Sequence, residues 1–180
     1  MRARGHELMV HLPMEPLARG KNPGPRALLK GLPEAELLKR LEWALSHLKG
    51  YVGVNNHMGS RLTRDPRAMA LVIARLKALG LLFVDSLTSI RSVAGIAARA
   101  AEVPNTERNI FLDHVGGRET IQGQLEIVER IARRRGYVVV IGHPRDATLE
   151  TIESWIAGAR ARGFVFVSIS GIVRGAHSRG

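Results

Sequence analysis

Five short apolar runs in this sequence each end in a side chain that can bind a metal ion or move a proton. The runs are rich in β-branched residues, which favour β-strands. When parallel strands alternate with helices, all strand C-termini lie at one edge of the sheet, and such folds place their active sites there. We therefore expect a polar floor at that edge, built by His11, His57, Asp85, Asp113 and His143.

Two histidines and one glutamate are the candidate metal ligands. His11 ends the first run, His57 ends the second, and Glu15 lies four residues after His11 on a proline-stiffened turn. Neighbouring strands lie about 4.8 Å apart, so the two imidazoles could converge on one ion at about 2.0 to 2.1 Å each. The chain has no cysteine. Imidazole and carboxylate ligands suit a divalent ion such as zinc.

Polar residues around His57 are candidates for orienting it or for binding a substrate. Asn55 and Asn56 precede His57, where a strand is normally apolar, and Ser60 follows it. A polar doublet before a ligand suits hydrogen bonds to that ligand or to a substrate. The same asparagines could instead form a turn.

His143, between Gly142 and Pro144, is the candidate general acid or base, because an imidazole titrates near neutral pH. Any one histidine at a strand end is more often a structural, hydrogen-bonded residue. Asp85 is a candidate catalytic residue and Asp113 a candidate substrate-binding residue. Capping of the turn that follows is an equal alternative for both, because strand-end aspartates commonly cap.

The runs alternate with amphipathic stretches, which predicts a repeated βα unit. Near-continuous apolar strands predict a parallel sheet covered on both faces, and an open doubly wound sheet or a partial βα barrel fits equally. At 180 residues and 45% hydrophobic content, we expect one domain over residues 1–180. The loop at 13–33 is long enough to suggest a functional segment or lid. The predicted strands cover 7–12, 52–57, 81–85, 109–113, 137–141 and 164–169, and the predicted helices cover 33–49, 65–79, 92–101, 119–135 and 148–161.

The chain is basic, with 27 Lys and Arg against 16 Asp and Glu and a net charge of +11. Such a balance raises the question of nucleic-acid binding. The cations are spread along the predicted helices, and aromatic residues make up only 4% of the chain, which leaves no stacking platform for bases. We expect no nucleic-acid partner and interpret the charge as a solvated basic surface or one attracted to anionic envelope polymers.

Several strings of the chain, taken together and in order, resemble the divergent polysaccharide deacetylases, relatives of the NodB-homology deacetylases. The resemblance covers Gly5 to about Ser170 and implies an irregular βα barrel. It also implies metal-dependent removal of acetyl groups from an envelope polysaccharide. The strings are GHELMVHLPMEP, NPGPRALL, GVNNHMGSRLT, LLFVDSLTS, NIFLDH and VVVIGHPRDATLETI.

The resemblance also implies roles for single residues. The classical deacetylase string GHExxxHxxxHP places its first ligand histidine on His11 and its second on Glu15, which departs from the usual metal triad. His57 is then the natural replacement ligand. The histidine that acts as acid in the classical enzymes corresponds to His143, and a carboxylate that orients the site corresponds to Asp85.

A second departure is at the N-terminus. Family members begin with a strand that carries an Asp-Asp pair, one a metal ligand and the other the catalytic base, whereas this sequence starts at the GHE string. We therefore expect a barrel that lacks its first two βα units. Either the gene start is mis-assigned or truncated, or the domain is a remnant that another chain completes. The strand at 7–12 would then be an exposed edge through which the chain could self-associate.

The expected partner is a polysaccharide or oligosaccharide. An intact family member is expected in the periplasm or cell envelope. This sequence as written has neither a signal peptide nor a run of roughly 20 apolar residues, so we expect no transmembrane segment and a cytoplasmic location. The alternative function is a non-catalytic glycan-binding or scaffold protein of the same fold.

Acetate release tests the expected impairment. We expect the 180-residue chain to release little acetate from an acetylated glycan in the presence of zinc, because the Asp-Asp strand is absent. An enzyme-coupled acetate assay measures this, with a classical deacetylase that has both aspartates as the positive control. Rapid zinc-dependent release by this chain would contradict the expectation.

Overall fold

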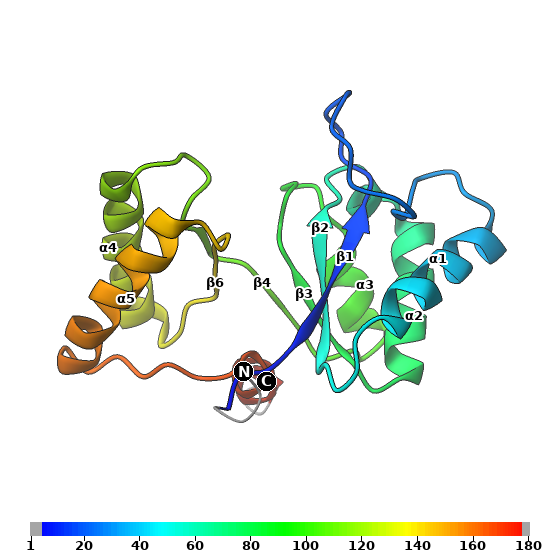
Figure 1. The fold of residues 1–180 in the computed structure, drawn as a ribbon. Coiled ribbons are helices and arrows are strands. Elements are labelled where there is room, and N and C mark those ends of the chain that lie inside the picture. The colour runs from blue at the N-terminus through cyan, green and yellow to red at the C-terminus, as the bar shows by residue number, and fades with distance from the viewer. Residues whose placement is uncertain (1–4, 178–180) are drawn as a thin grey trace. The chain divides into compact units, whose positions relative to one another are not determined.

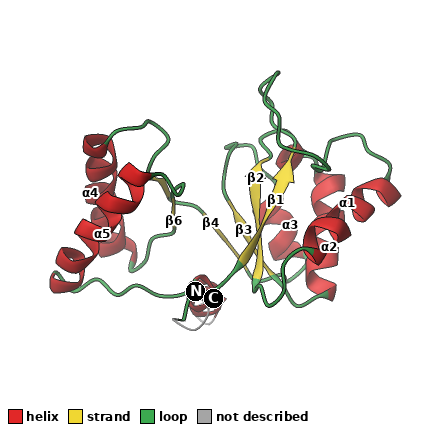
Figure 2. Ribbon diagram, viewed as in Figure 1, coloured by secondary structure: helices red, strands yellow, loops and turns green. Residues whose placement is uncertain are grey.

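The computed structural model describes residues 5–177 and divides into two compact units. The first unit comprises Met1–Glu107 and Ser168–Gly180, and the second comprises Arg108–Val167. Figure 1 shows the order of the elements along the chain and Figure 2 distinguishes helices from strands.

The first unit is built on a four-stranded parallel sheet with the order β1-β2-β3-β4. Its register sets His11 of β1 opposite Asn55 of β2, and Asn55 opposite Val84 of β3. The outer side of β1 is covered at its C-terminal end by Leu28, whose backbone bonds to Pro13 and Glu15. The strands are β1 (Met9–Met14), β2 (Gly53–Met58), β3 (Leu82–Asp85) and β4 (Asn105–Glu107).

Three helices cover one face of this sheet, namely α1 (Glu34–Ser46), α2 (Pro66–Ala78) and α3 (Ala94–Ala100). The N-terminus of α2 is capped as the sequence predicts. The Asp65 carboxylate accepts hydrogen bonds from the backbone N–H groups of Arg67 and Ala68. A short 3₁₀ turn, η2 (Leu62–Arg64), joins β2 to α2.

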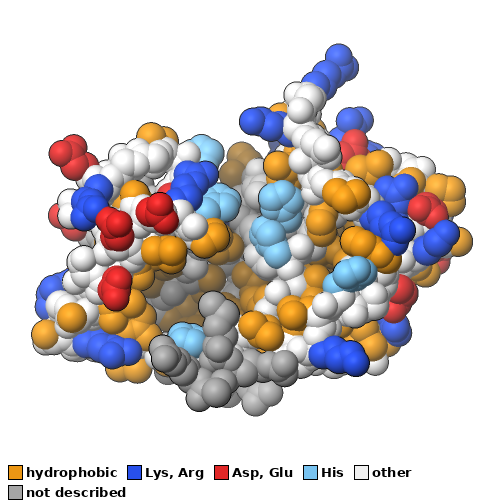
Figure 3. Space-filling model, in the orientation of Figure 1, with side chains coloured by type: hydrophobic (Ala, Val, Ile, Leu, Met, Phe, Trp, Pro, Cys, Tyr) orange, Lys and Arg blue, Asp and Glu red, His pale blue; other side chains and the backbone are white. Residues whose placement is uncertain are grey.

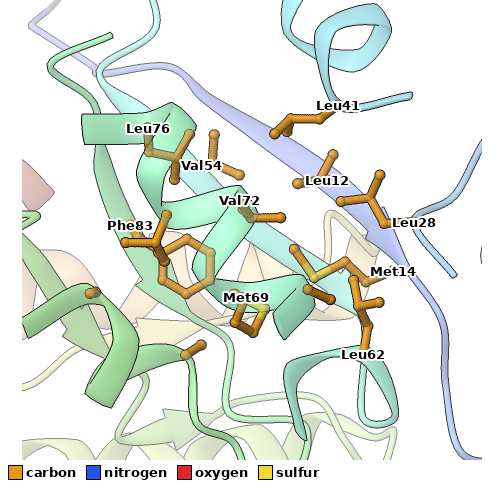
Figure 4. Close-up of a cluster of buried hydrophobic side chains, with 14 of the residues drawn as sticks. Leu12, Met14, Leu28, Leu41, Val54, Leu62, Met69, Val72, Leu76 and Phe83 are labelled. Atoms are coloured by element: carbon orange, nitrogen blue, oxygen red, sulfur yellow. The ribbon is translucent and has the colours of Figure 1, made fainter. Parts of the chain in front are cut away.

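Strand alternation sends one set of side chains into the core and the other to the opposite face. Leu12, Val54 and Phe83 enter the core beneath the helices, where they pack with Met69 and Val72 (Figure 4). His11, Asn55 and His57 occupy the alternate positions. They therefore lie on the face that α1, α2 and α3 leave open.

Helix α6 (Ile169–His177) belongs to the first unit and packs on that opposite face. Its Val173 is fully buried against Leu82 and Val84 of β3, next to Met9 of β1. This face is therefore apolar towards the strand N-termini and polar towards their C-termini. The polar half carries the candidate site.

The second unit contains two short parallel strands and two helices. Strands β5 (Ile110–Phe111) and β6 (Val140–Ile141) pair directly, and α4 (Arg118–Arg135) and α5 (Asp146–Ala161) pack beside them. Leu112 is buried with Ile121, Leu125 and Val128 of α4. Gly136 ends α4 in the left-handed conformation, at φ 80°, that favours glycine.

The predicted α/β fold with parallel strands is confirmed, but two elements differ from the prediction. Strand β4 was not predicted, and it interrupts the strict alternation because β5 follows it without a helix. The strand predicted at 164–169 is wrong, since 164–168 have no regular structure and Ile169 begins α6. Propensity favoured a strand there, but a strand needs a paired neighbour. Closure of a barrel and a single domain over the whole chain stay predictions.

Gly53 is needed for the close approach of β2 and β3. A Cβ there would lie 2.4 Å from the backbone oxygen of Leu82, which cannot move without disturbing the sheet. We expect Gly53→Ala to lower the free energy of unfolding by about 1 to 3 kcal/mol or more. Urea unfolding followed by circular dichroism measures this. The control is Gly123→Ala, on an open helical position, which is expected to be neutral or stabilising by up to about 1 kcal/mol. Equal stability of the two variants would contradict this account.

Candidate functional site

Two histidines, His11 within β1 and His57 near the C-terminal end of β2, contact each other directly. His11 Nε2 lies 2.9 Å from His57 Nδ1, and the ring centroids are 4.8 Å apart at an angle of 69°. The register explains the contact. Pro13 is opposite His57, so His11 lies diagonally across from it on the same face. His11 is exposed and His57 is half-buried, and histidine side chains lie side by side on the open face (Figure 3).

A chain of hydrogen bonds sets the tautomer of His11. The Ser86 hydroxyl donates to the Asn56 backbone oxygen at 2.8 Å, so it accepts from the Asn55 amide nitrogen at 3.3 Å. The Asn55 amide oxygen therefore faces His11 Nδ1, at 3.0 Å. That nitrogen must be the donor, because an amide oxygen only accepts. Neutral His11 consequently presents the lone pair of Nε2 towards His57.

Asn56 ties the ends of β2 and β3 together. Its side chain is 1% exposed, its amide oxygen accepts from the Ser86 backbone N–H at 2.8 Å, and its amide nitrogen donates to the Met58 oxygen at 2.8 Å. Met58 and Leu87 have positive φ values of 55° and 46°. Non-glycine residues adopt this region at a cost and tend to do so at functional sites.

Asp85 caps the turn after β3. It is fully buried, and its carboxylate accepts from the Leu87 N–H at 2.8 Å and from the Ser92 hydroxyl at 2.6 Å. These bonds match the capping alternative that the sequence left open. Ser60 also satisfies a backbone group of a loop, since its hydroxyl accepts from the Leu17 N–H at 2.8 Å.

Glu15 is held away from the histidine pair by contacts of its own. Its carboxylate accepts from the Lys30 N–H at 2.6 Å and lies 3.4 Å from the Arg61 guanidinium. Its backbone oxygen accepts from the N–H groups of Arg61 and Leu62. Glu15 thus organises the loop after β1, and its predicted role as a metal ligand stays a prediction.

The second unit holds a separate polar group around Asp113. His143 Nδ1 lies 3.1 Å from Asp113 Oδ1, and the His143 backbone N–H donates to Oδ2 at 2.8 Å. The Thr148 hydroxyl donates to the same oxygen at 3.0 Å. Since a carboxylate accepts, His143 Nδ1 carries the proton and Nε2 is the nitrogen left for proton exchange. The His143 side chain is 45% exposed, which leaves it accessible.

Opposing effects act on the Asp113 carboxyl, which is 1% exposed. Burial raises its pKa, because a charge is costly away from water. The backbone N–H and ring of His143 and the Thr148 hydroxyl stabilise the anion, and together they bring the pKa of Asp113 below its ordinary value. Asp113 is therefore a fixed anion that orients His143.

The structure thus joins His11 to His57, and His143 to Asp113, but it does not gather a full ligand set. Among the residues described, no group of three or more His, Cys, Asp or Glu side chains could hold a metal ion. Sequence reasoning missed Ser86 and Thr148. Ser86 directly follows a predicted strand-end aspartate, which was the available signal. Thr148 carried no such signal, because in the sequence it is an ordinary residue of a predicted helix.

A groove of about 810 Å³ runs between α4 and α5 in the second unit. Leu125 and Trp155 line it together with exposed arginines such as Arg130. None of the predicted site residues contributes to this groove. No helix in the described part of the chain is long and apolar enough to cross a membrane.

Residues 1–173 match the family model for divergent polysaccharide deacetylase, and the chain belongs to this family. It is 33% identical over 153 residues to an uncharacterized protein of Haemophilus influenzae, covering 85% of this chain and 54% of that protein. It is also 33% identical to the uncharacterized protein YibQ of Escherichia coli, covering 84% of this chain and 47% of YibQ. The chain thus spans about half the length of these curated relatives.

A solved structure confirms the fold. The crystal structure of an uncharacterized protein of Agrobacterium tumefaciens superimposes with a TM-score of 0.92 at 32% sequence identity, covering 95% of this chain and 70% of that one. The resemblance found in the sequence is therefore confirmed at the level of family and fold.

The buried Asp113 anion predicts a pH-dependent contribution to stability. Because its pKa is lowered on folding, the contribution is complete above the ordinary carboxyl pKa and is lost as the pH falls through the lower, folded-state pKa. We expect Asp113→Asn to lower the free energy of unfolding by about 1 to 3 kcal/mol at neutral pH. The difference from the unchanged chain should shrink at about pH 3.

Urea unfolding at both pH values measures this difference. Asp146→Asn is the matched control, because Asp146 is exposed in the first turn of α5 in the same unit. A difference that stayed constant between the two pH values would rule out a charge-based contribution of Asp113.

Proposed function

We propose that this chain is a metal-dependent deacetylase-like domain for an acetylated envelope polysaccharide, with the low acetate release that its sequence leads us to expect. The observation that carries the proposal is the His11–His57 pair, with nitrogens facing at 2.9 Å. Family membership supports the class of reaction. The proposal is limited to the domain formed by this chain, because the match covers only about half the length of each curated relative.

The histidine pair would supply two nitrogen ligands to a divalent cation such as zinc. Two nitrogens bound at about 2.0 to 2.1 Å to a tetrahedral ion lie roughly 3.3 Å apart, so the observed pair would have to open by only about 0.4 Å. Asn55 already holds His11 in the tautomer that presents Nε2 as a ligand. Such an outer hydrogen bond to the other ring nitrogen is the usual support for a metal-bound histidine.

The chain's own residues would orient the ligand side chains and transfer protons. A bound divalent ion supplies Lewis acidity and lowers the pKa of a water molecule. Ser86 and Asn55 fix the orientation of His11. In the second unit, Asp113 fixes His143 with Nδ1 protonated, so Nε2 would first have to take up a proton before the imidazole could pass it to a leaving amine.

A second candidate, a glycan-binding domain without hydrolysis, is favoured by specific contacts. His11 Nε2 and His57 Nδ1 are hydrogen-bond partners of each other at 2.9 Å. The Asp85 carboxylate is occupied by capping bonds, and that of Glu15 is occupied by Lys30. In this alternative the strand-end residues stabilise the fold, and the polysaccharide binds without reacting.

Zinc titration by calorimetry separates the two candidates. We expect near-stoichiometric binding to the unchanged chain and its loss in His11→Ala and in His57→Ala. Asn55→Ala should weaken binding by about 10- to 100-fold, because it removes only the bond that orients His11. The control is His47→Ala, since the His47 ring bonds to the Trp43 backbone oxygen on α1. No zinc binding, with retained glycan binding, would favour the non-catalytic candidate.

A further inference from the structure

A small basic pocket lies beside the turn that follows β2. Its volume is about 180 Å³, and it is lined by Leu17, Lys30, Arg61 and Arg64. All three of its charged lining residues are cations. The turn begins directly after β2, which carries His57. Two of the lining residues, Arg61 and Arg64, therefore come only a few residues after His57 in the sequence.

Backbone and side-chain hydrogen bonds hold the walls of the pocket together. The Leu17 N–H donates to the Ser60 hydroxyl at 2.8 Å, and the Arg61 N–H donates to the Glu15 oxygen at 3.0 Å. The Glu15 carboxylate accepts from the Lys30 N–H at 2.6 Å. The long loop after β1 is thus fastened to the turn after β2, and the pocket is preformed.

The acidic residues nearby do not neutralise the cations tightly. The closest approach of Arg61 to Glu15 is 3.4 Å and that of Lys30 to Asp65 is 3.8 Å. Asp65 is already engaged as the cap of α2. The side chains of Lys30 and Arg61 are 53% and 51% exposed. Three cations line the pocket against two nearby carboxylates, so the pocket keeps a net positive charge.

Arg64 adds a cation without a matching acid. Within the described part of the chain its side chain has no ion pair. It is half-buried and lines the pocket. Figure 3 shows Lys and Arg side chains over the loop that follows β1, in the same part of the first unit.

We propose that Lys30, Arg61 and Arg64 bind an oxyanion carried by the glycan, a carboxylate or a phosphate group. A guanidinium presents paired donors that match such groups, and a lysine adds a point charge. The pocket holds one such group with part of a sugar ring. Only the assignment to a glycan rests on the proposed function, because binding of an oxyanion follows from the pocket itself.

A sugar-borne anion fits better than nucleic acid. The pocket is short, its neutral lining residue is Leu17, and no aromatic side chain lines it on which a base could stack. A nucleic-acid site would instead extend the basic surface along several phosphates. Duplex DNA is therefore included as a competing ligand.

The test is calorimetric titration of the full chain at about 0.15 M salt, where exposed charges are screened beyond about 8 Å. The ligands are oligogalacturonate, inorganic phosphate, a neutral chito-oligosaccharide and duplex DNA. We expect one of the two oxyanion ligands to bind and the neutral sugar to bind more weakly. Oligogalacturonate would identify the group as a carboxylate, whereas phosphate alone would identify it as a phosphate.

Variants locate the site. Arg64→Ala should weaken oxyanion binding by about tenfold or more, since it removes a charged donor. Arg67→Ala removes the same charge from an exposed position outside the pocket and should change affinity less than about twofold. Lys30→Ala is a second variant, and circular dichroism checks that each protein is folded.

Equal weakening in Arg64→Ala and Arg67→Ala would overturn the proposal, because it would show general charge attraction. So would binding of the neutral sugar as tight as that of the acidic one, or DNA binding that depends on Arg64. The His11→Ala variant keeps this test independent of the proposed catalysis. It should lose zinc binding and retain the oxyanion.

Discussion

The parallel pairing of β1 with β2 is the constraint on which the first unit depends. Its register places Leu12 and Val54 under the helices and His11 and Asn55 on the opposite face. A slip of one residue would exchange the two faces. It would put an imidazole into the apolar core and separate His11 from His57. Burial of the core therefore also fixes the distance between the two histidines.

The strand ends are held by buried polar groups that satisfy one another. Asn56 and Ser86 bond reciprocally across β2 and β3. No buried side-chain nitrogen or oxygen in the described residues lacks a hydrogen-bond partner. An unpaired buried polar group would cost about 1 to 3 kcal/mol. This network also allows Met58 and Leu87 to hold unfavourable φ values where the chain leaves the sheet.

The sequence predicted elements whose local pattern agrees with their surroundings. Asp65 before a proline predicted the start of α2, because the capping residue acts within its own turn. The polar strand β4 could not be predicted, since Asn105–Glu107 lacks strand propensity and is a strand through pairing with β3. The strand prediction at 164–168 was wrong for the opposite reason. The residues favour a strand, but strand propensity alone does not supply a neighbouring strand to pair with. The position of Glu15 depends on Lys30 and Arg61, which are distant in sequence.

The chemistry of the side chains separates the strand-end residues into two kinds. A carboxylate accepts several hydrogen bonds, so the turn after its own strand can satisfy Asp85, and the residues after β6 can satisfy Asp113. Both are buried at little net cost. A neutral imidazole donates a hydrogen bond from one nitrogen and accepts one at the other. Backbone N–H groups can therefore satisfy only the accepting nitrogen. His11 and His143 therefore each bond Nδ1 to a fixed acceptor, and Nε2 of His11 takes its partner from the neighbouring strand, at His57. Hydrogen bonds thus occupy the carboxylates of both aspartates, and the proposed function therefore rests on the histidines.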